Sequence, residues 1–168
     1  MRKKIAVFDF DGTITKTDTL FAFIIHARGV FYLLGALLLY SPLILISFLG
    51  FYEKGRIKES AFKFLFEGYN INYFNSLCTS FGRSYCSKNL RPKAVDKIHE
   101  LEHEGIEVFV VTASIANWVS PIITSLGIKP TNLIATEISV DSNGNLTGSF
   151  STPNCKGDEK VRRLELRL

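Results

Sequence analysis

The hydrophobic positions along the chain alternate between short continuous apolar runs and longer amphipathic segments. The short runs are rich in β-branched and aromatic residues and end at glycine or polar residues, which predicts buried strands. These strands cover residues 5–10, 107–111 and 133–136. The amphipathic segments predict helices over residues 18–26, 54–68, 72–86, 92–103, 117–126 and 157–168.

The order of these elements predicts an α/β fold with a doubly wound, Rossmann-like parallel sheet. Two further short strands, 138–140 and 146–150, flank an Asn-Gly turn and predict a small β-hairpin. Residues 1–17 and 89–168 form the predicted core, and residues 18–88 are inserted into it as a helical cap.

The apolar stretch from Gly29 to Tyr52 contains no charged residue. It has the length of a transmembrane helix, for which about 20 residues suffice. A single crossing would separate Asp9 from Thr112, two candidate site residues that must lie close together. We therefore expect Ser41-Pro42 to break the stretch into two apolar halves, because proline removes a helical hydrogen bond. The halves form either a hairpin that dips into one leaflet or a pair of buried cap helices.

The composition is that of a folded protein without a disulfide framework. Of the 168 residues, 46% are hydrophobic and 21% are charged, which excludes an intrinsically disordered chain. The cysteines Cys78, Cys86 and Cys155 are odd in number and form no Cys-x-x-Cys pair. Neither disulfides nor a zinc site is therefore expected.

The charge pattern bears on partners and location. The net charge of +4 is spread along the chain without a basic stripe, so no nucleic-acid partner is expected. The basic N-terminus leads into an apolar run that Asp9 and Asp11 interrupt, so no export signal is expected. We expect a cytoplasmic protein, attached to the inner face of the membrane if residues 29–52 dip into it.

Two carboxylates, Asp9 and Asp11, stand where the first predicted strand runs into a turn at Gly12. One carboxylate can attack an electrophile while its neighbour transfers a proton to the leaving group. Carboxylate oxygens are also the ligands that Mg²⁺ prefers. The alternative is a turn whose aspartates only cap the next helix.

Two later segments carry groups suited to binding an anion. Thr112 is expected to end the second strand immediately before a helix, where its hydroxyl and the following backbone N–H groups face an anion. Lys156 and Lys160 offer a cation at the start of the last helix. Taken singly, an ordinary helix entry explains Thr112 better than an anion site does, and a surface position is the better explanation of either lysine.

Together, in this order, the segments resemble the motifs of the haloacid dehalogenase superfamily of phosphohydrolases. The first motif is DFDGTIT at 9–15, the second VVTAS at 110–114 and the third CKGDEK at 155–160. The run as a whole resembles the phosphoserine-phosphatase-like subgroup, subfamily IB, whose helical cap lies between the first two motifs.

The resemblance implies a role for each matching residue. Asp9 would be the nucleophile that forms an aspartyl-phosphate, and Asp11 the general acid and then base. Mg²⁺ would be held by the Asp9 carboxylate and the Asp11 backbone carbonyl. Lys160, slightly favoured, or Lys156 would stabilise the charge. The phosphate and substrate would be bound by Gly12, Asp18, Thr112, Ala113 and Ser114, although helix capping explains Asp18 equally well.

The sequence departs from the family pattern in two respects. Thr112-Ala113-Ser114 stands where phosphoserine phosphatases usually have Ser-Gly-Gly, which argues against phosphoserine as the substrate. The fourth, acidic motif that completes the Mg²⁺ site is expected after the last helix, and the sequence ends at Leu168. On this pattern we expect part of the core to be missing, the strand beginning at Ile5 to form an exposed edge, and activity to be low.

These features predict an Mg²⁺-dependent phosphomonoester hydrolase that acts on a small phosphorylated metabolite. One alternative is a membrane-associated phosphatase for a lipid phosphate, such as phosphatidylglycerophosphate. The others are an inactive truncated member of the family and a phosphate-binding module without turnover. The oligomeric state is left open by the sequence.

Overall fold

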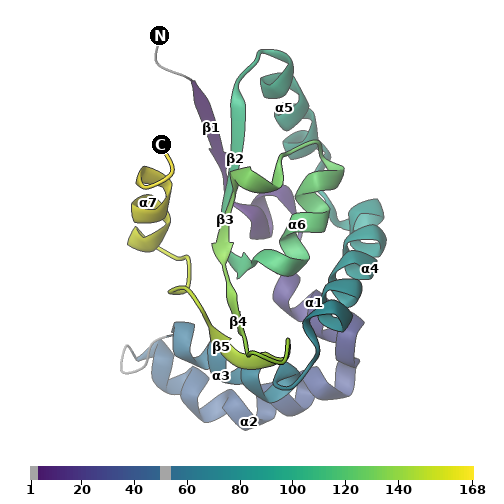
Figure 1. Ribbon diagram of the computed structural model, residues 1–168, viewed down its shortest axis with the longest axis vertical. Coiled ribbons are helices and arrows are strands. Elements are labelled where there is room, and N and C mark those ends of the chain that lie inside the picture. The colour runs from purple at the N-terminus through teal and green to yellow at the C-terminus, as the bar shows by residue number, and fades with distance from the viewer. Residues whose placement is uncertain (1–3, 50–53) are drawn as a thin grey trace.

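The computed structural model describes residues 4–49 and 54–168 (Figure 1). The first half contains β1 (Ile5–Phe8), the wide turn η1 (Phe10–Ile14), α1 (Thr19–Arg28), α2 (Val30–Phe48), α3 (Lys54–Phe66) and α4 (Ile71–Asn89). The second half contains α5 (Pro92–His103), β2 (Glu107–Ile115), α6 (Ala116–Ser125), η2 (Pro130–Asn132), β3 (Leu133–Thr136), β4 (Ile138–Val140), β5 (Leu146–Phe150) and α7 (Asp158–Glu165).

The central sheet is parallel, with β2 between β1 and β3. Val7 pairs with Phe109 on one side of β2, and Leu133 pairs with Val110 on the other. Helices α5 and α6 lie on one face of the sheet and α7 lies on the opposite face (Figure 1). This arrangement confirms the predicted doubly wound α/β core with its helical insert and hairpin. Within the described ranges β1 pairs on one side only, and Val7 is 45% exposed.

The insert shares its hydrophobic core with the α/β core. Phe23 of α1 stacks on Trp118 of α6 at 4.7 Å between ring centroids, and both side chains are buried. A smaller apolar cluster, with Phe109, Val111 and Cys155, lies under α7 on the other face of the sheet. Because one core runs through α1, α4 and α6, the insert is anchored to the sheet by packing.

The predicted hairpin is present and packs on α3. The Asp141 carboxylate stabilises its turn by accepting hydrogen bonds from the backbone N–H groups of Asn143 (2.9 Å) and Asn145 (2.8 Å). Gly148 of β5 has φ +80°, and a Cβ there would lie 2.8 Å from the Cα of Lys63 in α3. Glycine therefore permits the close approach of the hairpin to this helix.

The prediction that Ser41-Pro42 breaks the apolar stretch is wrong, because α2 continues through Pro42 as one helix. Proline has no N–H to donate to the carbonyl oxygen of Leu38, four residues earlier. The hydroxyl of Ser41 donates to that oxygen instead, at 2.8 Å. The replacement bond satisfies the carbonyl that proline leaves unpaired, so the helix is not interrupted.

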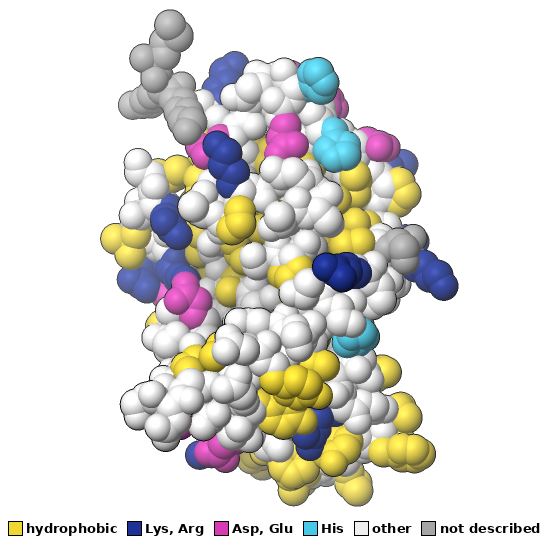
Figure 2. Space-filling view, turned by 45° about the vertical axis from the view of Figure 1, so that its right-hand side comes forward, with side chains coloured by type: hydrophobic (Ala, Val, Ile, Leu, Met, Phe, Trp, Pro, Cys, Tyr) yellow, Lys and Arg dark blue, Asp and Glu magenta, His cyan; other side chains and the backbone are white. Residues whose placement is uncertain are grey.

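The expectation of buried cap helices is also wrong for α2. Phe31 is 83% exposed and Leu38 79% exposed, and 17% of the most hydrophobic window of the helix is buried. By length and composition α2 is long and apolar enough to cross a membrane. Hydrophobic side chains gather at the lower end of the molecule in Figure 2, where Figure 1 places α2. The rest of the predicted stretch, residues 50–52, lies outside the described residues.

Candidate active site

Asp9 stands directly after β1, at the carboxyl end of the sheet. Its Oδ1 accepts a hydrogen bond from the backbone N–H of Phe10 at 2.8 Å and so caps the turn that follows. The strand predicted through Phe10 ends at Phe8, because Phe10 and Ile14 are buried as part of that turn. Gly12 has φ +75° inside it, a conformation that glycine adopts without the steric penalty of a side chain.

Lys160 of α7 forms an ion pair with Asp9. Its Nζ lies 2.8 Å from Asp9 Oδ1, and the side chains are 26% and 49% exposed respectively. Lys156 is exposed and precedes the helix. Of the two lysines that the sequence left open, Lys160 is therefore the one that the fold brings to the nucleophile position.

Asp11 is held in place by three donors. Its Oδ1 accepts from the backbone N–H (2.8 Å) and the hydroxyl (2.7 Å) of Thr19, and its Oδ2 accepts from the Ser114 hydroxyl (2.6 Å). Trp118 Nε1 in turn donates to the Thr19 hydroxyl at 3.2 Å. Since the rotamers of both donor residues are constrained by buried partners, the Asp11 carboxylate is oriented by the core itself.

The second predicted motif lies inside the sheet. Thr112 was expected to end its strand immediately before a helix, but β2 continues to Ile115, which pairs with Thr136 after a register shift. Thr112 is buried, and its Oγ1 accepts from the backbone N–H of Ser114 at 3.0 Å. This segment thus positions Ser114 against Asp11, a contact that the sequence did not predict.

The cap adds a cation that the sequence does not distinguish from its neighbours. Lys58 of α3 donates from Nζ to the carbonyl oxygen of Ala113 at 2.5 Å. Burial lowers the pKa of Lys58 to about 8, against the attraction of Asp11 and Asp18, which raises it. The sequence gives little reason to choose Lys58 as a site residue, because it is one of four basic residues in the predicted helix 54–68.

Asp18 caps α1 as expected, accepting from the backbone N–H of Leu20 at 2.8 Å. Desolvation raises the pKa of the Asp18 carboxyl above its ordinary value although the residue is partly solvent-exposed, and the negative charge of Asp11 acts in the same direction. Asp18 therefore feels the charges of Asp11 and Lys58 from its position at the start of α1.

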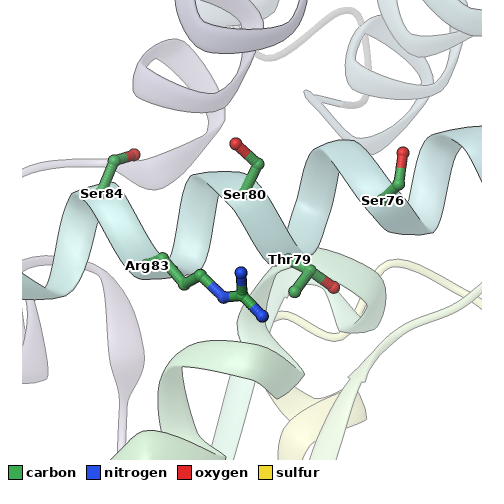
Figure 3. A pocket seen from close by; sticks show the side chains of 5 residues that line it. All are labelled: Ser76, Thr79, Ser80, Arg83 and Ser84. Atoms are coloured by element: carbon green, nitrogen blue, oxygen red, sulfur yellow. The ribbon is translucent and has the colours of Figure 1, made fainter.

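A surface hollow of about 690 Å³ lies along α4, away from the three motifs. Figure 3 shows that Ser76, Ser80 and Ser84 point to one side of this helix and Arg83 and Thr79 to the other. Because these side chains diverge and none belongs to the three motifs, this hollow lacks the converging polar groups of a catalytic site.

The oxygen atoms at the end of β1 are of the type that Mg²⁺ prefers as ligands. No group of three or more His, Cys, Asp or Glu side chains suited to a metal occurs in residues 4–49 and 54–168. Mg²⁺ is commonly held through one or two carboxylates together with water and a substrate phosphate. The half-exposed Asp9 carboxylate and the Asp11 backbone carbonyl supply oxygen donors of this type.

The parallel sheet, the helical insert and the Asp9, Asp11 and Lys160 cluster define a hydrolase of the haloacid dehalogenase class. The family model for haloacid dehalogenase-like hydrolases matches residues 6–168, so the chain belongs to this family. Its members are typically Mg²⁺-dependent.

The chain is similar to curated and structurally characterised proteins over most of its length. It is 30% identical to Protein CicA of Caulobacter vibrioides over 160 residues, which covers 95% of this chain and 70% of CicA. A protein of unknown function from Bordetella pertussis Tohama I has a TM-score of 0.81 at 21% identity, over 99% of this chain and 74% of that one. A phospho-aspartyl intermediate analogue of phosphoserine phosphatase has a TM-score of 0.63 at 20% identity, over 99% and 71%. The fold is thus close to phosphoserine-phosphatase-like proteins.

Proposed function

We propose that the protein is an Mg²⁺-dependent phosphomonoester hydrolase that works through an aspartyl-phosphate on Asp9. The observation that carries the proposal is the ion pair of Asp9 with Lys160 beside an Asp11 carboxylate fixed by Thr19 and Ser114. A nucleophile, a proton donor and a cation therefore meet at the end of β1. Membership of the hydrolase family supports the same chemistry.

The first half-reaction transfers the phosphoryl group to Asp9. Both contacts to Asp9 from the described residues involve Oδ1, which leaves Oδ2 to attack phosphorus. The bond from phosphorus to the substrate oxygen breaks, and protonated Asp11 gives its proton to that oxygen as the alcohol leaves. Lys160 stabilises the negative charge of the phosphoryl oxygens during transfer.

The second half-reaction restores the enzyme. Asp11, now a carboxylate, takes a proton from a water molecule whose oxygen attacks phosphorus. The bond between phosphorus and Asp9 breaks, which releases inorganic phosphate and the free carboxylate. Mg²⁺ held by Asp9 and the Asp11 carbonyl would neutralise phosphate charge in both halves.

The substrate we propose is a small phosphorylated metabolite, bound with its phosphate near Gly12 and the segment from Thr112 to Ser114. A phosphoserine phosphatase that has been solved with substrate bound has the same fold at 20% identity. Because Ala113 and Ser114 replace the glycines usual in that subgroup, phosphoserine itself is not the proposed substrate.

The test is hydrolysis of p-nitrophenyl phosphate by the purified chain, with Mg²⁺ and with a chelator. We expect turnover with Mg²⁺, loss of turnover with the chelator, and no turnover by Asp9→Asn. The matched control is Asp96→Asn, since Asp96 is an exposed aspartate on α5. Turnover by Asp9→Asn equal to that of the wild type would overturn the mechanism. Phosphate binding without turnover in folded wild type would favour the phosphate-binding module.

A second candidate function is a membrane-associated phosphatase that acts on a lipid phosphate at the inner face of the membrane. It is favoured by the exposed apolar surface of α2, where Phe31, Leu38 and Leu45 are 83%, 79% and 67% exposed. Contiguous apolar surface of this kind marks a membrane or protein contact.

Vesicle flotation tests this second function. We expect the wild type to float with vesicles of phosphatidylglycerol and phosphatidylcholine, and the double variant Phe31→Glu, Leu38→Glu to remain in solution. Leu166→Glu is the matched control, because Leu166 is 75% exposed but lies after α7 rather than on α2. Equal flotation of the double variant and the control would exclude α2 as the contact.

A further inference from the structure

An apolar cavity of about 270 Å³ lies between α1, α2 and α3. Its walls are hydrophobic side chains from all three helices, among them Leu20, Ile24, Leu33, Ala36 and Ile57. Lys58 is the charged residue of the lining. Helix α2, whose outer surface is exposed, forms one wall.

The cavity adjoins the candidate active site through two direct links. Thr19 donates to Asp11, and the next residue of α1, Leu20, lines the cavity. Lys58 also lines the cavity, while its Nζ reaches the carbonyl oxygen of Ala113 in the second motif. Its aliphatic stem thus belongs to the apolar wall and its charge to the polar site, as is common for long basic side chains.

The size and lining select the chemistry of the occupant. The cavity of about 270 Å³ exceeds severalfold the roughly 30 Å³ that one water molecule occupies in the liquid. The lining is mostly apolar, with Tyr40, Ser47 and Lys58 as its polar members, so a polar group placed there would lose hydration for few partners. A hydrocarbon chain gains free energy from burial. The positive charge of Lys58 at the junction is complementary to a phosphate held at Asp9.

We propose that the small phosphorylated substrate is a phosphate monoester carrying one hydrocarbon chain, with the chain in this cavity and the phosphate at Asp9 and Asp11. This inference rests on the proposed phosphatase function and adds the site that selects the substrate. The chain would lie along Leu20 and Lys58 and pack against the apolar side chains of α2.

The experiment measures calorimetric binding of butyl-, hexyl- and octylphosphonate, all below their critical micelle concentrations and with Mg²⁺ present. An alkylphosphonate carries the same charged group as a phosphate ester, but its P–C bond is not hydrolysed, so binding can be measured without turnover. We expect the affinity to rise about fourfold for each methylene that the cavity buries. An affinity independent of chain length would overturn the proposal.

Ala36→Phe fills the cavity and should abolish the rise with chain length. Leu34→Phe is the matched control, because Leu34 is 54% exposed on the same helix and is absent from the cavity lining. A folded Ala36→Phe protein with the wild-type rise would overturn the proposal. If Ala36→Phe fails to fold, cross-linking of wild type with a photoreactive octylphosphonate decides. Attachment of the probe to peptides from α1 to α3 would support the cavity as the hydrocarbon site. Attachment only to other peptides would overturn the proposal.

Hydrolysis of p-nitrophenyl phosphate, measured in parallel, separates this inference from the proposed function. Absence of hydrolysis together with a chain-length effect contradicts the phosphatase and supports the hydrocarbon site. Hydrolysis without a chain-length effect supports the phosphatase and overturns the hydrocarbon site.

Discussion

Lys160 Nζ lies 2.8 Å from Oδ1 of Asp9, although the two residues come from nearly opposite ends of the sequence. Asp9 follows β1 on one side of β2, and Lys160 lies in the first turn of α7, which packs on β2 and β3. The ion pair therefore depends on the assembled sheet. It offers a cation for a phosphate at Asp9, and it distinguishes Lys160 from its neighbour Lys156.

Replacement of this lysine should affect turnover selectively. We expect Lys160→Met to lower kcat for p-nitrophenyl phosphate by about a hundredfold to a thousandfold, the usual loss for one charge-stabilising donor. Lys156→Met should stay close to wild type because Lys156 is exposed and outside the helix. Steady-state kinetics of the two variants provide the check, and the reverse order of effects would assign the role to Lys156.

Replacement of the proton donor should depend on the leaving group. Asp11→Asn retains the one acceptor oxygen that Thr19 needs but cannot protonate the departing alcohol, so kcat should fall by about a hundredfold to ten-thousandfold for an alkyl phosphate. The loss should be smaller for p-nitrophenyl phosphate, whose leaving group needs no proton. Equal losses on both substrates, measured by phosphate release, would contradict the role of Asp11 as general acid.

The buried ammonium of Lys58 should make stability depend on pH. Its pKa is about 8 in the folded protein, and its ordinary value is 10.5. Between these values the unfolded chain binds more protons, so the contribution of Lys58 to stability rises with pH. Asp11, Asp18 and Cys155 favour its charge, and Lys156 opposes it.

Lys58→Met removes this titrating group while keeping an apolar stem of similar length. The stability of the variant relative to wild type should therefore be greatest below pH 8 and should decrease from pH 8 to 10.5. Urea unfolding across this range measures the difference. Two parallel stability curves would show that Lys58 is not desolvated in the folded state.

The contact of the hairpin with α3 can be tested by a pair of glycine replacements. Gly148→Ala places a Cβ 2.8 Å from the Lys63 Cα, whereas Gly144→Ala meets nothing nearer than 3.8 Å. The two glycines have φ of +80° and +78°, so the backbone strain is shared. Gly148→Ala should be less stable than Gly144→Ala by about 1–3 kcal/mol, the cost of overpacking. Equal unfolding midpoints for the two variants, in heat or urea, would mean that the hairpin can shift away from α3 at no cost in stability.

Most elements were predictable because their signals are local. The helix cap at Asp18, proline at the start of α5, and the short apolar runs all act within a few residues. The error at Pro42 has a local cause as well, since the sequence shows the missing N–H but not that the Ser41 hydroxyl replaces it.

The candidate site was predictable in part. Asp9 and Asp11 are predictable because they stand beside a strand end and a glycine turn. Thr112 is predictable from its place in the second motif, although β2 continues past it to Ile115. The donors that orient Asp11 are not predictable, because Thr19 and Ser114 meet it only after α1 and β2 have packed together. The sequence does not single out Lys58 for the same reason, since nothing in its own helix marks it as the residue that reaches Ala113.

The sequence by itself determined most of the strands, helices and turns of this protein, and the identity of the acidic residues at the end of β1. Hydrogen bonding and hydrophobic periodicity within a few residues are enough to specify such features. Only the tertiary structure decided that Lys160 meets Asp9, that α2 stays exposed, and that a cavity opens beside Lys58. Those outcomes depend on contacts between segments far apart in the chain, and such contacts are set by packing of the whole core rather than by local pattern.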